Sequence, residues 1–410
     1  MKVLVLNAGS SSQKSCLYQL TEAALPEQPP KPLWEAHIDW TAAPEVGVLQ
    51  VKALGKKLEA RLDANVRHGA IAQMLNTLVA GDTQVLDQLS DIDIIGHRVV
   101  HGGTEYSQAT LVTPDVKDAI ARLSTLAPAH NPANLEGIEA IEQILGDVTQ
   151  VAVFDTAFHS QMPPSSAVYP IPYEWFEQGI RRYGFHGISH QYCAQRSAQL
   201  LGKPLAELKL IICHLGNGCS LVAIQQGISV DTTMGFTPLE GLMMGSRSGS
   251  IDPAILIHLM RSHQFDADRL DAMLNKQSGL MGISGLSADM RTILDATQTG
   301  NKRAQLAFDL YIHRLRASIG SMLATLGGLD ALVFTAGVGE NAVAVRARTC
   351  ERFEFLGLNL DVEKNASSPI DQDIATTDSA VRVLVIHTEE DWAIAQQCWR
   401  MITMEKCRII

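Results

Sequence analysis

Arginine and histidine side chains beside glycines are the residues of this 410-residue chain best suited to chemistry. They occur in three runs, HRVVHGG at His97–Gly103, RRYGFHGISH at Arg181–His190 and MGSRSGS at Met244–Ser250. A guanidinium binds phosphate or carboxylate through two parallel hydrogen bonds, and glycine lets the backbone approach a ligand closely. Arg98 and Arg247 therefore predict anion binding, with an ordinary surface arginine as the alternative for each.

A strand-and-turn pattern occurs twice in the sequence, 207 residues apart. Val3–Asn7 and Leu210–His214 are apolar segments that each end in a polar side chain, before a glycine-bearing turn and a second apolar run. The pattern predicts two β-hairpins whose turns present backbone N–H groups to an anion. A repeat at about half the chain length predicts two similar domains that face one ligand across a cleft.

Two further glycine-rich segments, Gly282–Gly285 and Gly337–Asn341, are predicted to be turns near a ligand. The absence of a GxxxxGKS or GxxxxGKT motif argues against a P-loop enzyme, and no GxGxxG motif opens a helix. The histidine pairs His97/His101 and His186/His190 lack the glutamate of an HExxH motif, so a zinc site is not favoured.

Acidic side chains follow two of the predicted strands. Asp155 comes directly after Val151–Phe154, and the cluster Glu389–Asp391 follows Val381–Ile386. Ligands of α/β proteins gather at the carboxyl ends of such strands, where Mg²⁺ and phosphate compensate a carboxylate. The alternative for the cluster is a solvated helix start, which the helix dipole favours.

The apolar pattern predicts an α/β chain of two domains. It indicates helix within residues 46–89, a strand at Ile92–Val100, a long amphipathic helix at Ala304–Leu326 and a final helix at Asp391–Ile410. The predicted domains are residues 1–150 and 151–387, with a terminal helix at about 388–410 that packs back on the first domain.

Composition excludes several classes of function. The net charge of −11 and the lack of a basic run argue against nucleic-acid binding. Seven cysteines without CxxC spacing are typical of reduced core thiols. No apolar stretch reaches about 18 residues and no signal peptide is evident, so we expect a soluble, cytoplasmic protein.

Seven segments in order along the chain resemble the acetate kinase family: NAGSSS from Asn7, HRVVHGG from His97, APAHNP from Ala127, FDTAFH from Phe154, RYGFHG from Arg182, HLGNG from His214 and GVGEN from Gly337. The resemblance implies the duplicated, actin-like α/β fold with an active-site cleft between two domains. It also implies ATP and ADP as nucleotides, Mg²⁺ with Mn²⁺ as an alternative, a homodimer, and reversible phosphorylation of acetate.

The resemblance also assigns residues to roles. Asn7 and Glu390 would be linked to the metal, and His186 and Arg247 would stabilise the transition state with Asp155 as the acidic residue. The acetate would contact Arg98, Val100, Pro238 and His130. The nucleotide and its phosphates would contact Lys14, Ser10, Ser12, His214, Leu215, Gly216, Asn217, Gly218, Asp289, Met290, Arg291, Gly337, Val338, Gly339, Glu340 and Asn341.

Departures from the family pattern bear on specificity. Ala129 stands where the family commonly has leucine, and a smaller side chain would widen the acyl pocket. The alternative activity is a propionate or butyrate kinase of the same family. A more remote alternative is an actin- or chaperone-like ATPase that uses the fold as a conformational switch.

Overall fold

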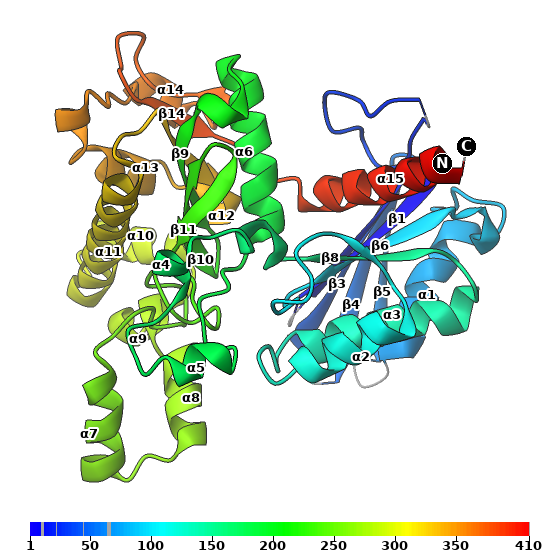
Figure 1. Cartoon of the computed structure of the whole chain (residues 1–410), viewed down its shortest axis with the longest axis horizontal. Coiled ribbons are helices and arrows are strands. Elements are labelled where there is room, and N and C mark those ends of the chain that lie inside the picture. Colours follow the sequence, from blue (N-terminus) through cyan, green and yellow to red (C-terminus); the bar gives the residue numbers. More distant parts are fainter. Residues whose placement is uncertain (10–11, 22, 44, 64–66, 410) are drawn as a thin grey trace. The chain divides into compact units, whose positions relative to one another are not determined.

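The computed structural model describes residues 1–9, 12–21, 23–43, 45–63 and 67–409. The chain forms two compact units, Met1–Ala157 together with Glu389–Ile410, and Phe158–Thr388 (Figure 1). Each unit is built on one mixed β-sheet. Among the described residues, no helix has the length and apolar content of a membrane span.

The sheet of the first unit has the strand order β5-β4-β3-β2-β1-β6-β8-β7. Strands β1 to β5 pair antiparallel in sequence order, β6 and β8 continue parallel to β1, and β7 pairs antiparallel with β8. The bounds are β1 (Lys2–Ala8), β2 (Ser12–Gln19), β3 (Trp34–Ala43), β4 (Val46–Ala53), β5 (Lys56–Asp63), β6 (Ile94–Val99), β7 (Thr110–Leu111) and β8 (Gln150–Phe154).

The sheet of the second unit has the order β11-β10-β9-β12-β14-β13. Its bounds are β9 (Lys209–Leu215), β10 (Cys219–Gln225), β11 (Ile228–Thr232), β12 (Ala331–Thr335), β13 (Gln372–Asp373) and β14 (Arg382–Val385). The strand order and strand directions of this second sheet match those of β3-β2-β1-β6-β8-β7 in the first unit. Both predicted hairpins are confirmed, as β1–β2 and β9–β10, and the first unit adds β4 and β5.

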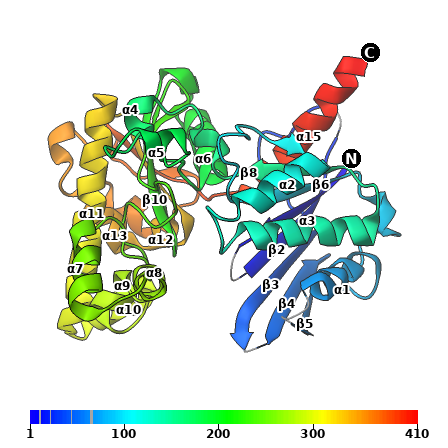
Figure 2. The same cartoon turned by 60° about the horizontal axis from the view of Figure 1, so that its bottom comes forward.

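Helices cover both faces of the first sheet (Figures 1 and 2). α1 (Arg67–Val79), α2 (Pro114–Leu123) and α3 (Asn131–Leu145) lie on one face. Leu4 and Leu6 share an apolar core with α1 and α3, and α2 contributes to a second core with β6 and β8. α15 (Glu390–Ile409) lies on the other face. Gly96 permits this approach, because a Cβ there would lie 2.5 Å from Ile394 Cγ2 and 2.6 Å from Cys398 Sγ.

The second unit has a matching arrangement. α6 (Gly187–Leu201) packs on β9 and β12, as α15 packs on β1 and β6, and α11 (Lys302–Leu326) packs on β10 and β11. The other helices are α4 (Pro164–Ala167), α5 (Glu174–Glu177), α7 (Pro253–His263), α8 (Ala267–Lys276), α9 (Gly279–Ser284), α10 (Met290–Gln298), α12 (Ala336–Asn341), α13 (Val343–Cys350) and α14 (Val362–Ala366), with 3₁₀ turns at Leu89–Asp91, Ala157–His159, Leu205–Glu207 and Glu354–Leu356.

Several local predictions were wrong. Residues 46–63 form β4 and β5 rather than helix. β4 lies between β3 and β5 and buries alternate residues, and β5 is the largely exposed edge strand of the sheet. The segments at 282–285 and 337–341 fall in or beside α9 and α12 rather than in turns. The boundary near residue 150 lies too early, since β8 pairs with β6 and belongs to the first unit. The helices predicted at Ala304–Leu326 and Asp391–Ile410 are confirmed as α11 and α15.

Candidate active site

Three strand ends and one helix start form a charged cluster in the first unit. Asn7 lies near the end of β1, Arg98 in β6, Asp155 after β8, and Glu390 opens α15. Because alternate strand residues point to the same face, Arg98 shares the α15 face with Gly96. The parallel pairing of β6 with β1 and with β8 places Asn7 and Asp155 on that face as well. These three side chains and Glu390, at the start of α15, therefore lie on one face of the sheet.

Arg98 and Asp155 form a buried ion pair. The Nε and Nη2 of Arg98 donate to Asp155 Oδ2 at 3.0 and 2.6 Å, and the side chains are 16% and 2% exposed. Burial raises the pKa of Asp155 and Arg98 opposes that shift. Burial alone lowers the pKa of Arg98, but the carboxylates of Asp155 and Glu390 raise it overall. The guanidinium therefore stays charged, and Asp155 fixes its orientation.

Two carboxylates orient the amide of Asn7. Its Nδ2 donates to Asp391 Oδ1 at 2.8 Å and to Glu390 Oε2 at 3.3 Å, which turns its Oδ1 toward Arg98 Nη1, 3.5 Å away. Cys16 donates to Asp391 Oδ2 at 3.6 Å, and burial raises the pKa of this thiol. The sequence reasoning gave Asp391 no role, although its place in the acidic cluster was a usable signal.

Two asparagines of α3 brace the strand ends, and sequence reasoning missed both. Asn134 accepts from the amide of Val100 and donates to the carbonyl of Ala8, each at 3.1 Å. Asn131 accepts from the amide of His101 at 3.0 Å and donates to its carbonyl at 3.1 Å. Both side chains are buried, so the ends of β1 and β6 are held together by satisfied polar groups.

His186 and His214 stack in the second unit, with ring centroids 4.0 Å apart and an interplanar angle of 19°. His214 occupies in β9 the place that Asn7 has in β1. His186 precedes α6 with a φ of 57°, a left-handed conformation that costs energy in a residue other than glycine. His186 Nδ1 lies 2.9 Å from Ser220 Oγ, and His214 Nδ1 lies 2.8 Å from Ser189 Oγ.

Arg247 lies beside the same turn. A Cβ added to Gly218 would lie 3.5 Å from Arg247 Nη1 and 3.6 Å from His186 Cε1. Arg247 Nη1 donates to the carbonyl of Pro238 at 3.0 Å, and burial lowers the pKa of the guanidinium. Among the described residues Arg247 makes no ion pair, in contrast to Arg98. A half-buried, unpaired guanidinium is suited to an anionic ligand.

The GVGEN segment starts α12 at the end of β12. Glu340 Oε1 accepts from the amides of Ala336 and Thr388 at 2.9 and 3.3 Å, and its Oε2 lies 2.6 Å from His387 Nδ1. Burial would raise the pKa of Glu340, but these hydrogen bonds lower it overall. Within the described chain, a Cβ at Gly337 would meet no atom within 4 Å, which leaves room beside the helix start.

The remaining predicted residues are more dispersed. Lys14 is exposed on β2 opposite Asn7, whereas Ser10 lies outside the described residues. Asp289 caps α10 and pairs with Arg291, and among the described residues no hydrogen bond joins either to His186, His214 or Arg247. The other placements are: Ser12 at the start of β2, Val100 buried after β6, His130 half-buried before α3, Met290 buried in α10, Leu215 buried at the end of β9, and Ala129 exposed.

The first-unit cluster offers the oxygen ligands that Mg²⁺ prefers. Asn7, Glu390, Asp391 and Asp155 supply amide and carboxylate oxygens, and the cationic Arg98 donates to Asn7 and Asp155. Burial and the neighbouring charge of Glu390 raise the pKa of Asp391, a penalty that a cation would relieve. In the described part of the chain, no group of three or more His, Cys, Asp or Glu side chains is arranged to hold a metal ion by itself. Mg²⁺ commonly takes one or two protein carboxylates together with water and substrate phosphates.

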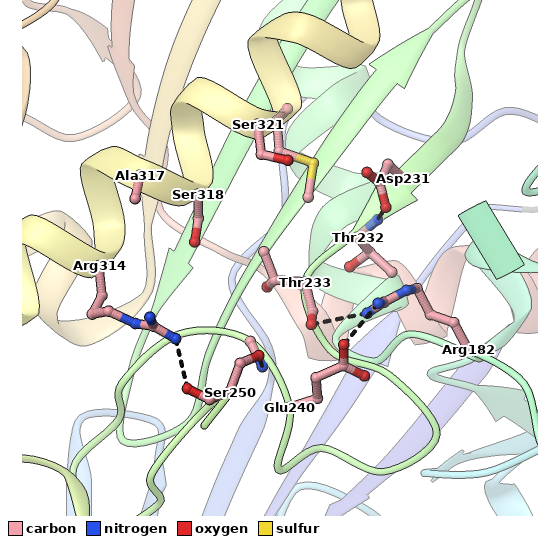
Figure 3. Close-up of a pocket in the computed structure, with 12 residues that line it drawn as sticks. Arg182, Asp231, Thr232, Thr233, Glu240, Ser250, Arg314, Ala317, Ser318 and Ser321 are labelled. Carbon is pink, nitrogen blue, oxygen red and sulfur yellow. Dashed lines mark hydrogen bonds and ion pairs between the residues drawn. The ribbon is translucent and has the colours of Figure 1, made fainter. Parts of the chain in front are cut away.

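A separate polar cavity of about 290 Å³ lies between β11 and α11 (Figure 3). Its two arginines are engaged: Arg182 pairs with Glu240 at 2.8 Å and Arg314 donates to the carbonyl of Ser250 at 2.7 Å. The residues that line it are Arg182, Asp231, Thr232, Thr233, Glu240, Gly241, Ser250, Arg314, Ala317, Ser318, Ser321 and Met322, and none of these was a predicted site residue.

The repeated six-strand pattern and the two polar groups at strand ends define an α/β protein of the duplicated, actin-like two-domain class. Residues 2–396 match the acetokinase family, and the chain belongs to that family. It is 67% identical to an acetate kinase of Rippkaea orientalis over 97% of this chain and 98% of that one, and 64% identical to an acetate kinase of Gloeothece citriformis over 99% and 100%.

Solved structures agree with this assignment. The crystal structure of Porphyromonas gingivalis acetate kinase superposes with a TM-score of 0.90 at 38% identity, covering 98% of this chain and 99% of the other. A propionate kinase from Francisella tularensis gives a TM-score of 0.88 at 38% identity, covering 97% and 99%. The predicted fold class and family are therefore confirmed.

Proposed function

We propose that this chain catalyses the reversible transfer of the γ-phosphoryl group of ATP to acetate, which yields acetyl phosphate and ADP. Family membership and the names of its relatives support this activity. Acetate is ionised at neutral pH, so its oxygen can attack phosphorus without a general base. The protein must then align the reactants and neutralise charge on the transferring group.

Arg98 is the proposed acetate ligand. Asp155 fixes two of its N–H groups, and the guanidinium remains charged, as carboxylate binding requires. Val100 would contact the methyl group, with Pro238 and His130 as further substrate contacts. Because Asp155 is committed to Arg98, we assign it the orientation of this arginine rather than the carriage of a proton.

Arg247 and His186 are the proposed stabilisers of the phosphoryl group. The observation that carries the proposal is the half-buried guanidinium of Arg247, which faces Gly218 beside His186 without an ion-pair partner among the described residues. Burial of an unpaired charge is costly, and an anionic phosphoryl group would compensate it. The HLGNG turn and the start of α12 are the proposed sites of the nucleotide phosphates.

Mg²⁺ would be held by Asn7 and Glu390, with Asp391 beside them. When bound, the ion would neutralise charge on the nucleotide phosphates. Asn7 is turned by Glu390 and Asp391 so that its amide oxygen lies on the side of Arg98.

The reverse reaction tests the proposed activity. The chain supplied with acetyl phosphate, ADP and Mg²⁺ is expected to form ATP, which luciferase detects, and the Arg247→Ala variant should form almost none. ATP formation that does not require acetyl phosphate, or none from the unaltered chain, would contradict the proposal.

We also propose that the chain forms a homodimer through α7. This eleven-residue helix has no buried side chain, and Ile255, Ile257 and Met260 are 46, 49 and 50% exposed. Such an apolar surface is typical of an interface, and a second copy is the commonest partner. The Ile255→Glu/Ile257→Glu variant is expected to be monomeric by light scattering, whereas Val362→Glu, which alters an exposed apolar side chain on α14, should stay dimeric. A monomeric unaltered chain, or a dimeric α7 variant, would contradict this proposal.

We expect propionate to be used nearly as well as acetate. Ala129 is exposed just before α3, so its small side chain leaves space where a leucine would project. One methylene in a pocket changes specificity by about 1 to 3 kcal/mol. Steady-state kinetics should give similar kcat/KM values for the two acids, and Ala129→Leu should favour acetate. A hundredfold preference of the unaltered chain for acetate would disprove this expectation.

A further inference from the structure

Four histidines of the second unit lie in one connected group, of which the proposed reaction uses only two. His159, His190, His186 and His214 follow one another, with ring centroids 5.8, 6.4 and 4.0 Å apart in that order. His159 and His190 are fully buried. His190 was considered only in an unfavoured zinc pair with His186, and His159 was assigned no role. Their link to His186 passes through one side chain, Ser220.

Ser220 has hydrogen-bond distances to two rings. Its Oγ lies 2.9 Å from His186 Nδ1 and 2.8 Å from His190 Nε2. A hydroxyl has one proton and two lone pairs, so it could accept from both rings only if its own proton had another acceptor. Ser220 is fully buried, and among the described residues its Oγ has no hydrogen bond except those to these two rings, so it donates to one ring and accepts from the other. The chain of hydrogen bonds therefore has two possible directions, and each direction fixes the tautomers of both histidines.

The environment of His190, at the buried end of this series of hydrogen bonds, selects one of the two directions. His190 Nδ1 is buried and has no hydrogen-bond partner among the residues that the structure describes. A proton on this nitrogen would be an orphaned buried donor, which is rarer and costlier than an unused acceptor. The proton of His190 therefore belongs on Nε2, which donates to Ser220, and the Ser220 hydroxyl in turn donates to His186 Nδ1.

His190 is held in its neutral form by its surroundings. Burial lowers the pKa of His190 well below its ordinary value, and the nearby His159 and His214 act in the same direction. His159 itself is buried, with a pKa lowered to about 4, and it is bound by Ser229 Oγ at 2.8 Å and the Phe185 carbonyl at 3.0 Å. Both His190 and His159 are thus held as neutral rings, each with a single ring proton.

We propose that Ser220 and His190 are positioning residues that hold His186 as a neutral imidazole with its proton on Nε2. A Cβ added to Gly218 would lie 3.7 Å from this Nε2 and 3.5 Å from Arg247 Nη1, so the N–H faces the same space as the guanidinium. There it donates a hydrogen bond to a phosphoryl oxygen. This inference rests on the proposed function for the identity of the ligand, but not for the tautomer.

The relay also opposes a second proton on His186. Protonation at Nδ1 would make this ring a donor to Ser220. The Ser220 proton would then either lose its acceptor or turn toward His190 Nε2 and force the proton of His190 onto Nδ1, and both outcomes leave a buried donor without an acceptor. The cationic Arg247 beside His186 acts in the same direction. His186 remains a directional donor of fixed charge while the phosphoryl group moves.

Nitrogen NMR on the full-length, ¹⁵N-histidine-labelled chain tests the relay without an activity assay. Signals of His186 and His190 are assigned from their loss in single variants at each position. We expect both rings to be neutral at pH 7 with the proton on Nε2. A proton on Nδ1 of either ring would overturn the proposal, and this result requires no variant to fold.

A variant at the far end tests the mechanism. His190→Gln keeps a hydrogen-bonding group near Ser220, but its amide can accept as well as donate, so the direction of the chain is no longer imposed. The midpoint of the His186 ring titration should rise by about one pH unit or more. Ser220→Thr, which keeps the hydroxyl, and Ser229→Ala, which removes a buried hydroxyl only from His159, should leave the midpoint in place. An unshifted midpoint in a folded His190→Gln variant would overturn the relay.

Kinetics separate this inference from the proposed function. In His190→Gln, the acid limb of the pH profile of kcat for acetyl phosphate formation should move to higher pH together with the midpoint of the His186 ring titration. The KM values should change little. A shifted ring titration with an unshifted acid limb would support the relay and remove His186 from the reaction. An inactive unaltered chain with the expected tautomers would contradict the proposed function alone.

Discussion

Replacing Arg247 with alanine is expected to lower turnover by about a thousandfold, the loss typical of an arginine that stabilises a transferring phosphoryl group. The fold should persist, because among the described residues the guanidinium of Arg247 makes one hydrogen bond, to the Pro238 carbonyl. Nucleotide binding should also persist, since the backbone of the HLGNG turn is unchanged. Initial rates of acetyl phosphate formation, with calorimetric binding of ATP, measure the two effects separately.

Arg303→Ala is the matched control for this experiment. Arg303 also donates to backbone carbonyls, those of Ile283 at 2.8 Å and Gly282 at 3.0 Å, but it lies at the exposed start of α11. This variant should keep nearly full turnover. Full activity of Arg247→Ala, or an equal loss in both variants, would contradict the role assigned to Arg247.

The second large effect is expected at Arg98. Arg98→Ala should raise the KM for acetate strongly and also destabilise the chain by about 3 to 5 kcal/mol, because it leaves the buried carboxylate of Asp155 without its partner. Adding Asp155→Asn should recover much of the stability, since an amide carries no charge. It should not recover acetate binding, because the guanidinium is still missing.

Chemical denaturation and acetate kinetics on the single and double variants measure these two outcomes. The Arg122→Ala variant is the control, since Arg122 makes an exposed ion pair with Glu105 at 2.9 Å in the same unit. Exposed pairs contribute little to stability, so this variant should lose at most about 1 kcal/mol and keep its KM. Recovery of acetate binding in the double variant would rule out Arg98 as the acetate ligand.

The strand-and-turn repeat was the part of the fold most accessible from sequence. Asn7 and His214 occupy matching places in β1 and β9, and the strand order repeats around them. The repeat was visible because buried central strands are continuous apolar runs bounded by glycine turns. The strands β4 and β5, of which β5 forms the edge of the sheet, escaped prediction, since half-exposed strands mix charged and apolar residues in a pattern that can resemble a helix face.

The site was predictable as a set of residue types but not as a set of contacts. Arg98 could be selected because glycines flank it, whereas its commitment to Asp155 depends on the register between β6 and β8. Asp391, Asn134 and Ser220 act through hydrogen bonds that join segments far apart in the chain. A single sequence carries no local signal for such partners.

The two hairpins have diverged in chemistry while keeping one geometry. Asn7 lies among carboxylates at the start of α15, and His214 lies among histidines and hydroxyls at the start of α6. The first set suits a metal ion and, through Arg98, a carboxylate, and the second suits nucleotide phosphates. The same strand-end position is thus suited to two different kinds of ligand in our proposal, because the covering helix brings different side chains to it.

A hydroxylamine trap for acyl phosphate tests the central claim most directly. The chain is incubated with ATP, Mg²⁺ and, in turn, formate, acetate, propionate or butyrate, and the acyl hydroxamate is measured as its ferric complex. We expect hydroxamate from acetate in an amount equal to the ADP formed, with a similar rate from propionate. The absence of hydroxamate from every acid, with or without ADP release, would contradict the claim that this chain phosphorylates a carboxylate.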